Sequence, residues 1–97
     1  MTKKDIAVIF KALGDENRIH ILHLLHEGEE CATNMLKQMN ISQPTFSHHM
    51  KILCDAGIVT SHKEGKWIRY RLCHEGIAVL RSGIEKLLDA CEKYENK

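Results

Sequence analysis

The hydrophobic period of this chain changes at Gly57, and this change limits the fold more than any other feature of the sequence. Before Gly57, apolar residues recur every three or four positions, which is typical of amphipathic helices. After it, residues 58–63 and 66–72 alternate around Glu64-Gly65, which predicts a two-stranded hairpin. Because 97 residues can bury only one core, we expect residues 1–97 to form a single, mainly α domain with one β-hairpin.

Five helical segments are expected around this hairpin. They cover residues 6–13, about 17–27, about 33–39, 43–56 and about 75–94. Asp15 or Asn17 can cap the second, and Ser42 can cap the fourth, with Pro44 in its first turn. The last helix carries a long apolar stripe that could pack against a partner.

A short helix, a turn at residues 40–42, a second helix and then a hairpin form the layout of a winged helix-turn-helix. The charge is distributed unevenly along this layout. Residues 5–41 contain three Lys or Arg against six Asp or Glu, whereas residues 42–72 contain five against two. Because a nucleic-acid footprint is local, the basic middle segment predicts a protein that binds double-stranded DNA.

The fourth helix and the hairpin supply the candidate DNA contacts. Short hydrogen-bonding side chains near a helix N-terminus can reach base edges, and Lys or Arg neutralise phosphates. The candidates for bases are Gln43, Thr45, Ser47 and His48, and those for phosphates are Lys51, Lys63, Lys66 and Arg69. His49 lies nearer the apolar stripe of Phe46, so a phosphate contact and a packing role both stay open for it.

Two other classes of protein were weighed. A winged helix can serve as a protein-interaction module without DNA binding, but the outer face of residues 43–51 would then usually be apolar or acidic. No Gly-rich phosphate loop, paired acid motif or metalloprotease-type His-Glu signature occurs, so we expect no enzyme. His20, His23 and His26 recur at a spacing that spreads them around a helix, which favours solvated or capping histidines over a metal site.

Several stretches of the sequence resemble the ArsR/SmtB family of bacterial metal- and stress-responsive repressors. They are residues 10–18, 41–53, 56–59 and 64–67, with the Ser-Gln-Pro-Thr-Phe-Ser-His-His block at 42–49. The resemblance implies a homodimer formed by the first and last helices. It also implies binding to palindromic operators in the cytosol and release from DNA when an inducer binds.

The cysteines bear on the inducer. Arsenic sensors of that family carry Cys-x-Cys before the third helix, and here the matching residues are Cys31-Ala32-Thr33. Sensors of nickel, zinc and cobalt place Asp and His on the last helix, but residues 75–97 contain no His. No cofactor is certain. Cys31 is the candidate for a thiol-bound metal or metalloid, Cys54 and Cys73 are expected to pack, and for Cys91 both packing and a sensing couple with Cys31 stay open.

The apolar run at residues 6–10 is too short for a signal-peptide core or a membrane span. We therefore expect a cytoplasmic protein that does not enter membranes. Since the four cysteines form no Cys-x-x-Cys pair, they are expected to be thiols in that reducing compartment.

Overall fold

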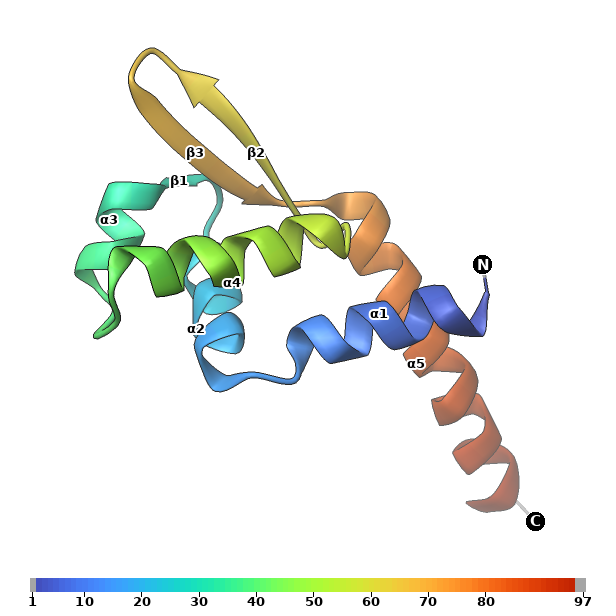
Figure 1. Cartoon of the computed structure of the whole chain (residues 1–97). Helices are drawn as coiled ribbons and strands as arrows, with labels where there is room; N and C mark the ends of the chain where they lie inside the picture. Colours follow the sequence, from blue (N-terminus) through green and yellow to red (C-terminus); the bar gives the residue numbers. More distant parts are fainter. Residues whose placement is uncertain (1, 96–97) are drawn as a thin grey trace.

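Helices make up most of the molecule, and one small sheet projects from them (Figure 1). The structure is a computed structural model that describes residues 2–95, so positions 1, 96 and 97 of the expected domain lie outside the described residues. Along that range the elements are α1 (Lys3–Leu13), α2 (Glu16–Leu24), β1 (Glu30–Cys31), α3 (Ala32–Lys37), α4 (Gln43–Asp55), β2 (Val59–Glu64), β3 (Trp67–Leu72) and α5 (His74–Glu95).

Side-chain caps set the starts of the helices. The Asp15 carboxylate accepts hydrogen bonds from the backbone N–H groups of Asn17 and Arg18 at 2.8 and 3.2 Å, so Asp15 is the N-cap of α2. Ser42 caps α4 by accepting from the backbone N–H of Thr45, and Pro44 lies in the first turn. These bonds satisfy N–H groups that have no partner within their own helix.

The expected bounds of three helices were wrong. The first begins at Lys3, three residues before Ile6, because Thr2 caps it there. The second helix ends at Leu24, because hydrogen-bonded turns over residues 25–28 follow it and Gly28 adopts a φ of 130°. The third begins at Ala32 and ends at Lys37, two residues before Met39. It starts early because the preceding residue, Cys31, is in a strand that changes direction into the helix.

The sheet has three antiparallel strands in the order β1-β3-β2, so the expected two-stranded wing was incomplete. In the central strand, Arg69 is opposite Cys31 of β1 on one side and His62 of β2 on the other. β1 is only two residues long and comes from the segment before α3. The wing is thereby attached to the start of the helix-turn-helix.

The core lies where α4 crosses the other helices and the base of the wing. The predicted stripe of Phe46, Met50 and Leu53 is fully buried there, together with Ile21 and Ile58. Burying such side chains contributes roughly 1.5–3 kcal/mol each to the free energy of unfolding. Among residues 2–95, no helix is both long enough and apolar enough to cross a membrane.

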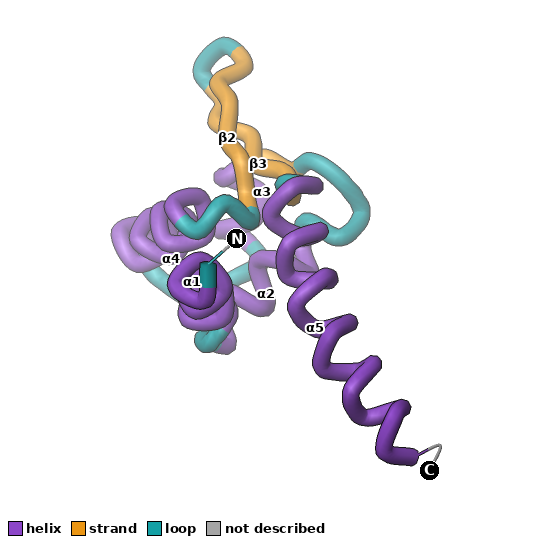
Figure 2. The backbone as a smooth tube through the Cα atoms, turned by 90° about the vertical axis from the view of Figure 1, so that its right-hand side faces the viewer, coloured by secondary structure: helices purple, strands orange, loops and turns teal. Residues whose placement is uncertain are grey.

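α5 packs on this core only through its first turns, and its second half extends away from the body of the molecule (Figure 2). Its start is held by a close approach of two glycines. A Cβ on Gly76 would come within 1.9 Å of the Gly57 carbonyl oxygen, so this position of α5 requires glycine. Gly57 itself has a φ of 78°, which favours glycine as well.

Candidate nucleic-acid interface

α4 presents one polar face to solvent and one apolar face to the core. Its exposed side carries the predicted base and phosphate candidates Gln43, Thr45, Ser47, His48 and Lys51. Because a helix turns by about 100° per residue, Ser47, His48 and Lys51 share one side with Pro44 and Asp55, while Phe46, Met50 and Leu53 occupy the other. Gln43 and Thr45 are exposed in the first turn, at the two edges of that polar side. The predicted division of this helix into two faces is confirmed.

Local bonds order part of that exposed face. The Ser42 hydroxyl donates to the Thr45 hydroxyl at 2.9 Å, which fixes both groups at the N-terminal end of α4. Lys51 forms an exposed ion pair with Asp55 at 2.9 Å, and the hydrogen bond to Asp55 raises the pKa of Lys51. Lys51 is therefore charged at neutral pH, although Asp55 offsets part of its field.

His49 is the one candidate on α4 that does not face solvent. Only 7% of its surface is exposed, and its Nδ1 lies 3.1 Å from Nη1 of Arg18 and 4.0 Å from the Asp15 carboxylate. The packing alternative left open by the sequence therefore describes His49, and a phosphate contact does not fit its burial. Because His49 lies at the edge of the apolar stripe, the spacing of residues alone could not decide between packing and a phosphate contact.

The cationic residues of the wing do not share one surface. Lys63 is opposite Ile68, whereas the neighbouring His62 is opposite Arg69, so Lys63 and Arg69 lie on opposite faces of the hairpin. Lys66 is in the turn between β2 and β3, and its Nζ lies 5.4 Å from the Trp67 ring centre. The ammonium group of Lys66 therefore extends from the tip of the wing beside an aromatic ring that is nearly half exposed.

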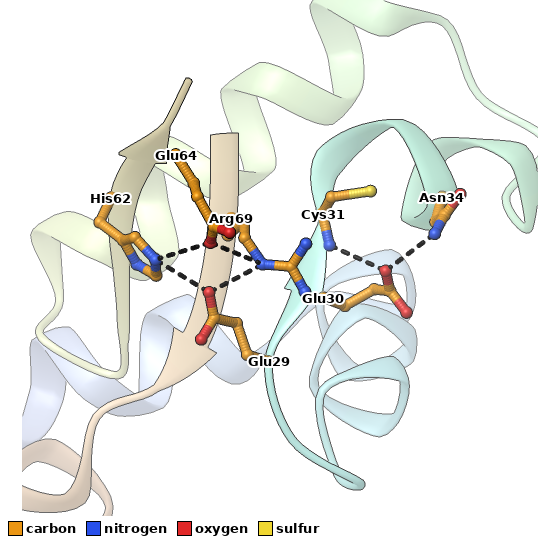
Figure 3. A network of polar contacts seen from close by, with 7 residues as sticks. All are labelled: Glu29, Glu30, Cys31, Asn34, His62, Glu64 and Arg69. Carbon is orange, nitrogen blue, oxygen red and sulfur yellow. Dashed lines mark hydrogen bonds and ion pairs between the residues drawn. The ribbon is translucent and has the colours of Figure 1, made fainter. Parts of the chain in front are cut away.

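Arg69 is held by two acidic side chains (Figure 3). Its Nε donates to Glu29 at 2.9 Å and lies 3.7 Å from Glu64. The hydrogen bond to Glu29 is the main reason why the pKa of Arg69 is raised. This predicted phosphate contact is therefore already paired within the molecule.

The cysteines occupy different environments. Cys31 is buried at the start of α3, and its backbone N–H donates to the Glu30 carboxylate at 2.8 Å. Cys54 and Cys73 are half-buried, and burial raises the pKa of the Cys54 thiol. Cys91 is exposed on the projecting half of α5. The three histidines of α2 and of the turn after it, His20, His23 and His26, are all exposed.

Three residues of this region were missed in the sequence. Arg18 contacts His49, while Glu29 and His62 meet at 2.9 Å beside the middle of the wing. No local pattern in the sequence predicts the pairing of Glu29 with His62. It forms only because β1 pairs with β3 and so brings the loop before β1 against the wing. For Arg18, the available signal was that it is the one arginine within residues 5–41, a segment in which Asp and Glu outnumber Lys and Arg.

A comparison with protein families finds a match over residues 15–61, which span α2 to the middle of β2, to the model described as "Bacterial regulatory protein, arsR family". The arsenical resistance operon repressor of Staphylococcus xylosus is 41% identical over 85 residues, which are 88% of this chain and 82% of that protein. The repressor of the same name from Staphylococcus aureus is 44% identical over 87 residues, with coverage of 90% and 81%.

Solved structures agree with these sequence matches. One is the homodimeric winged helix-turn-helix DNA-binding domain of a possible ArsR-family transcriptional regulator from Mycobacterium bovis. It is 26% identical, covers 94% of this chain and 84% of its own, and superposes with a TM-score of 0.73. From the sequence matches and the winged helix-turn-helix architecture together, we conclude that this chain belongs to the arsR family of bacterial regulatory proteins and is a transcriptional regulator, not an enzyme.

Proposed function

We propose that this protein is a cytoplasmic, homodimeric repressor that places its two copies of α4 in successive major grooves of a palindromic operator. The observation that supports this most directly is the exposure of Gln43, Thr45, Ser47 and His48 near the N-terminus of a helix whose core-facing side is buried. A major groove admits a helix, and such side chains match the donor and acceptor patterns of base edges. Lys51 and the wing-tip Lys66 supply contacts to phosphates.

Dimer formation is supported by apolar surface that the single chain leaves in solvent. Ile84, Leu87 and Leu88 of α5 are 45%, 64% and 52% exposed, and they lie on the half of the helix that extends from the core. On α1, Val8 and Phe10 are also exposed. Burying this surface against a second copy would remove it from water. To reach successive major grooves, the two α4 helices of that dimer would have to lie about 34–36 Å apart.

The inducer is a soft, thiophilic species that binds at Cys31. This part of the proposal is supported by the arsenical resistance repressors among the relatives and by the position of Cys31 beside β3. Thr33 replaces the second thiolate of the Cys-x-Cys pattern, so a second sulfur ligand would have to come from another cysteine. A ligand bound at Cys31 acts directly on the segment that joins the wing to α3.

DNA selection from a random pool, followed by titration of selected and scrambled duplexes, tests the DNA-binding part. The wild-type protein should prefer the selected duplex, and Gln43→Ala should reduce that preference at a cost of about 1–3 kcal/mol if the contact is bidentate. Gln38→Ala is the matched control, because Gln38 is an exposed amide at the end of α3 whose side chain donates to Asn34. Equal binding of every duplex by the wild-type protein would refute the proposal and favour a protein-interaction module.

Sedimentation tests the dimer. Leu87→Glu places a charge on the exposed apolar surface of α5 and should convert the dimer to monomer, with loss of operator binding. Exposed Glu85 forms an ion pair on the same helix, so Glu85→Gln is the control that should leave the dimer intact. For the inducer, arsenite, antimonite and cadmium should release DNA from the wild-type protein but not from Cys31→Ser, and the response of Cys91→Ser tells whether Cys91 supplies the second sulfur.

A further inference from the structure

Three side chains that can ligate a metal converge on the outer part of the wing, between its middle and its turn (Figure 3). Glu29 comes from the loop before β1, while His62 and Glu64 come from β2. One ligand atom of each lies within 4.8 Å of the other two, and this is the single group of its kind among residues 2–95. It differs from the Cys31 site, because the Cys31 sulfur is turned away from these three side chains.

The separations are near those that a metal ion imposes. His62 Nε2 lies 2.9 Å from Glu29 Oε1 and 3.9 Å from Glu64 Oε2. Ligands in a tetrahedron around zinc, at bond lengths near 2.1 Å, are about 3.4 Å apart. The observed distances lie on either side of that value, so small rotations of exposed side chains are enough to form the site.

The sheet register holds the ligands together in the absence of an ion. His62 is opposite Arg69 and Glu64 is opposite Trp67, so both ligands of β2 project from one face of the hairpin. Arg69 then links that face to Glu29 through its 2.9 Å hydrogen bond. Its guanidinium therefore supplies a positive charge at the place where the two carboxylates and the imidazole meet.

The net charge of the cluster favours the binding of a divalent cation. Two carboxylates face one guanidinium, so the cluster keeps an excess of negative charge while His62 is neutral. Among the described interactions, the Nε of Arg69 contacts the two carboxylates and not the imidazole of His62. A divalent ion could use the two carboxylates and the imidazole nitrogen at once.

We propose that the wing binds one divalent transition-metal ion of the zinc, cobalt and nickel class through Glu29, His62 and Glu64, where the loop before β1 meets the hairpin. The imidazole favours this class over magnesium and calcium, which take oxygen ligands. The lack of a thiolate distinguishes it from the soft species expected at Cys31. The ion replaces Arg69 as the partner of the carboxylates and ties the loop before β1 to the hairpin.

Metal titration of the reduced full-length protein without DNA tests this proposal. Zn²⁺ is measured by calorimetry in competition with a chelator, and Co²⁺ by its visible absorption. We expect one ion per chain, bound in the wild-type and Cys31→Ser proteins alike, with a Co²⁺ spectrum that lacks thiolate charge transfer. His62→Gln and Glu64→Gln should each weaken binding at least tenfold, since each removes one of three ligands.

Two further variants separate a metal site from a purely structural ion pair. Arg69→Met removes the competing cation and should tighten metal binding, whereas a network built only around Arg69 would show no such gain. His20→Gln alters an exposed histidine of α2 and should have no effect. The proposal is overturned if no ion binds, if His62→Gln binds as the wild type does, or if Cys31→Ser abolishes binding. Because no DNA is present, these results do not depend on the proposed repressor function.

Discussion

Arg18 and His49 contact each other between α2 and α4, with 3.1 Å from Arg18 Nη1 to His49 Nδ1. A guanidinium can only donate hydrogen bonds, so Nδ1 must accept and a neutral His49 carries its proton on Nε2. The Nε of Arg18 donates to the carbonyl of Ala12 at 2.6 Å. One arginine thereby joins the end of α1 to the buried side of the helix proposed to read DNA.

His49→Ala should lower the free energy of unfolding by about 1–3 kcal/mol, because it leaves a donor of Arg18 without its partner and removes a buried ring. The ratio of selected to scrambled DNA affinity should stay unchanged, since His49 does not face solvent. Chemical denaturation and DNA titration measure the two effects separately.

The adjacent residue provides the control for that experiment. His48 is exposed, so His48→Ala should alter the free energy of unfolding by less than about 0.5 kcal/mol while it weakens DNA binding. The opposite result, with a stable His49→Ala protein that has lost its sequence preference, would contradict the assignment of these two faces.

Lys66 and Arg69 should differ in their effect on salt dependence. Each phosphate contact contributes about 0.9 to the slope of log affinity against log salt concentration. Lys66→Ala should reduce the slope by about that amount per subunit, because Lys66 lies at the free tip of the wing. Arg69→Ala should change it less, because Arg69 is already paired with Glu29 and Glu64. Titrations over a range of salt concentrations decide this, and equal losses would show that Arg69 leaves its partners on DNA.

Gly76→Ala should destabilise the protein by about 1–3 kcal/mol or more, because the new methyl group would overlap the carbonyl of Gly57. Gly83→Ala is the matched control. It lies in the same helix with no atom within 4 Å of an added Cβ, so it should stabilise the helix by up to about 1 kcal/mol. Thermal unfolding of both variants measures the difference, and equal stability of the two would contradict the close contact of α5 with the turn that follows α4.

Asp15→Asn should remove part of the loss of stability in acid. Partial burial alone would raise the pKa of Asp15, but the hydrogen bonds from the N–H groups of Arg18 and Asn17 and the charge of the Arg18 guanidinium lower it below its ordinary value. A lowered pKa means that the charged form stabilises the fold above the ordinary pKa of about 3.9, and that this contribution is lost as the pH falls further.

Asparagine keeps the cap without the charge, so the variant isolates this effect. Denaturation at pH 7 and at several values below pH 4 should show the wild-type protein losing its advantage over Asp15→Asn. Asp5 and Glu30, whose pKa values are also lowered, are present in both proteins and cancel in the comparison. A constant difference between the proteins at every pH would contradict this account.

Much of the fold was predictable because its helices carry local signals. The apolar period of Phe46, Met50 and Leu53 and the caps at Asp15 and Ser42 follow from the sequence, and the structure has all of them. β1 gave no such signal. Two residues, Glu30 and Cys31, are too few to show alternation, and their partners Tyr70 and Arg69 lie far along the chain.

The candidate site, too, could be predicted from the sequence only in part. The exposed face of α4 could be predicted from helical geometry alone, whereas the burial of His49 depends on Arg18, which folding brings from another helix. The pairing of Arg69 with Glu29 depends on the third strand. Composition identified Arg69 as a free cation, and only the tertiary structure shows what holds it.

The short strand β1 has a mechanical consequence. Cys31 is the N-cap of α3 and also lies opposite Arg69 of β3. The start of that helix is therefore paired directly with the middle strand of the wing. A displacement of the backbone at Cys31 therefore displaces β3 of the wing as well. A signal received at this cysteine could reach the arm that approaches DNA in a single step, without a relay of side-chain rearrangements through the packed interior.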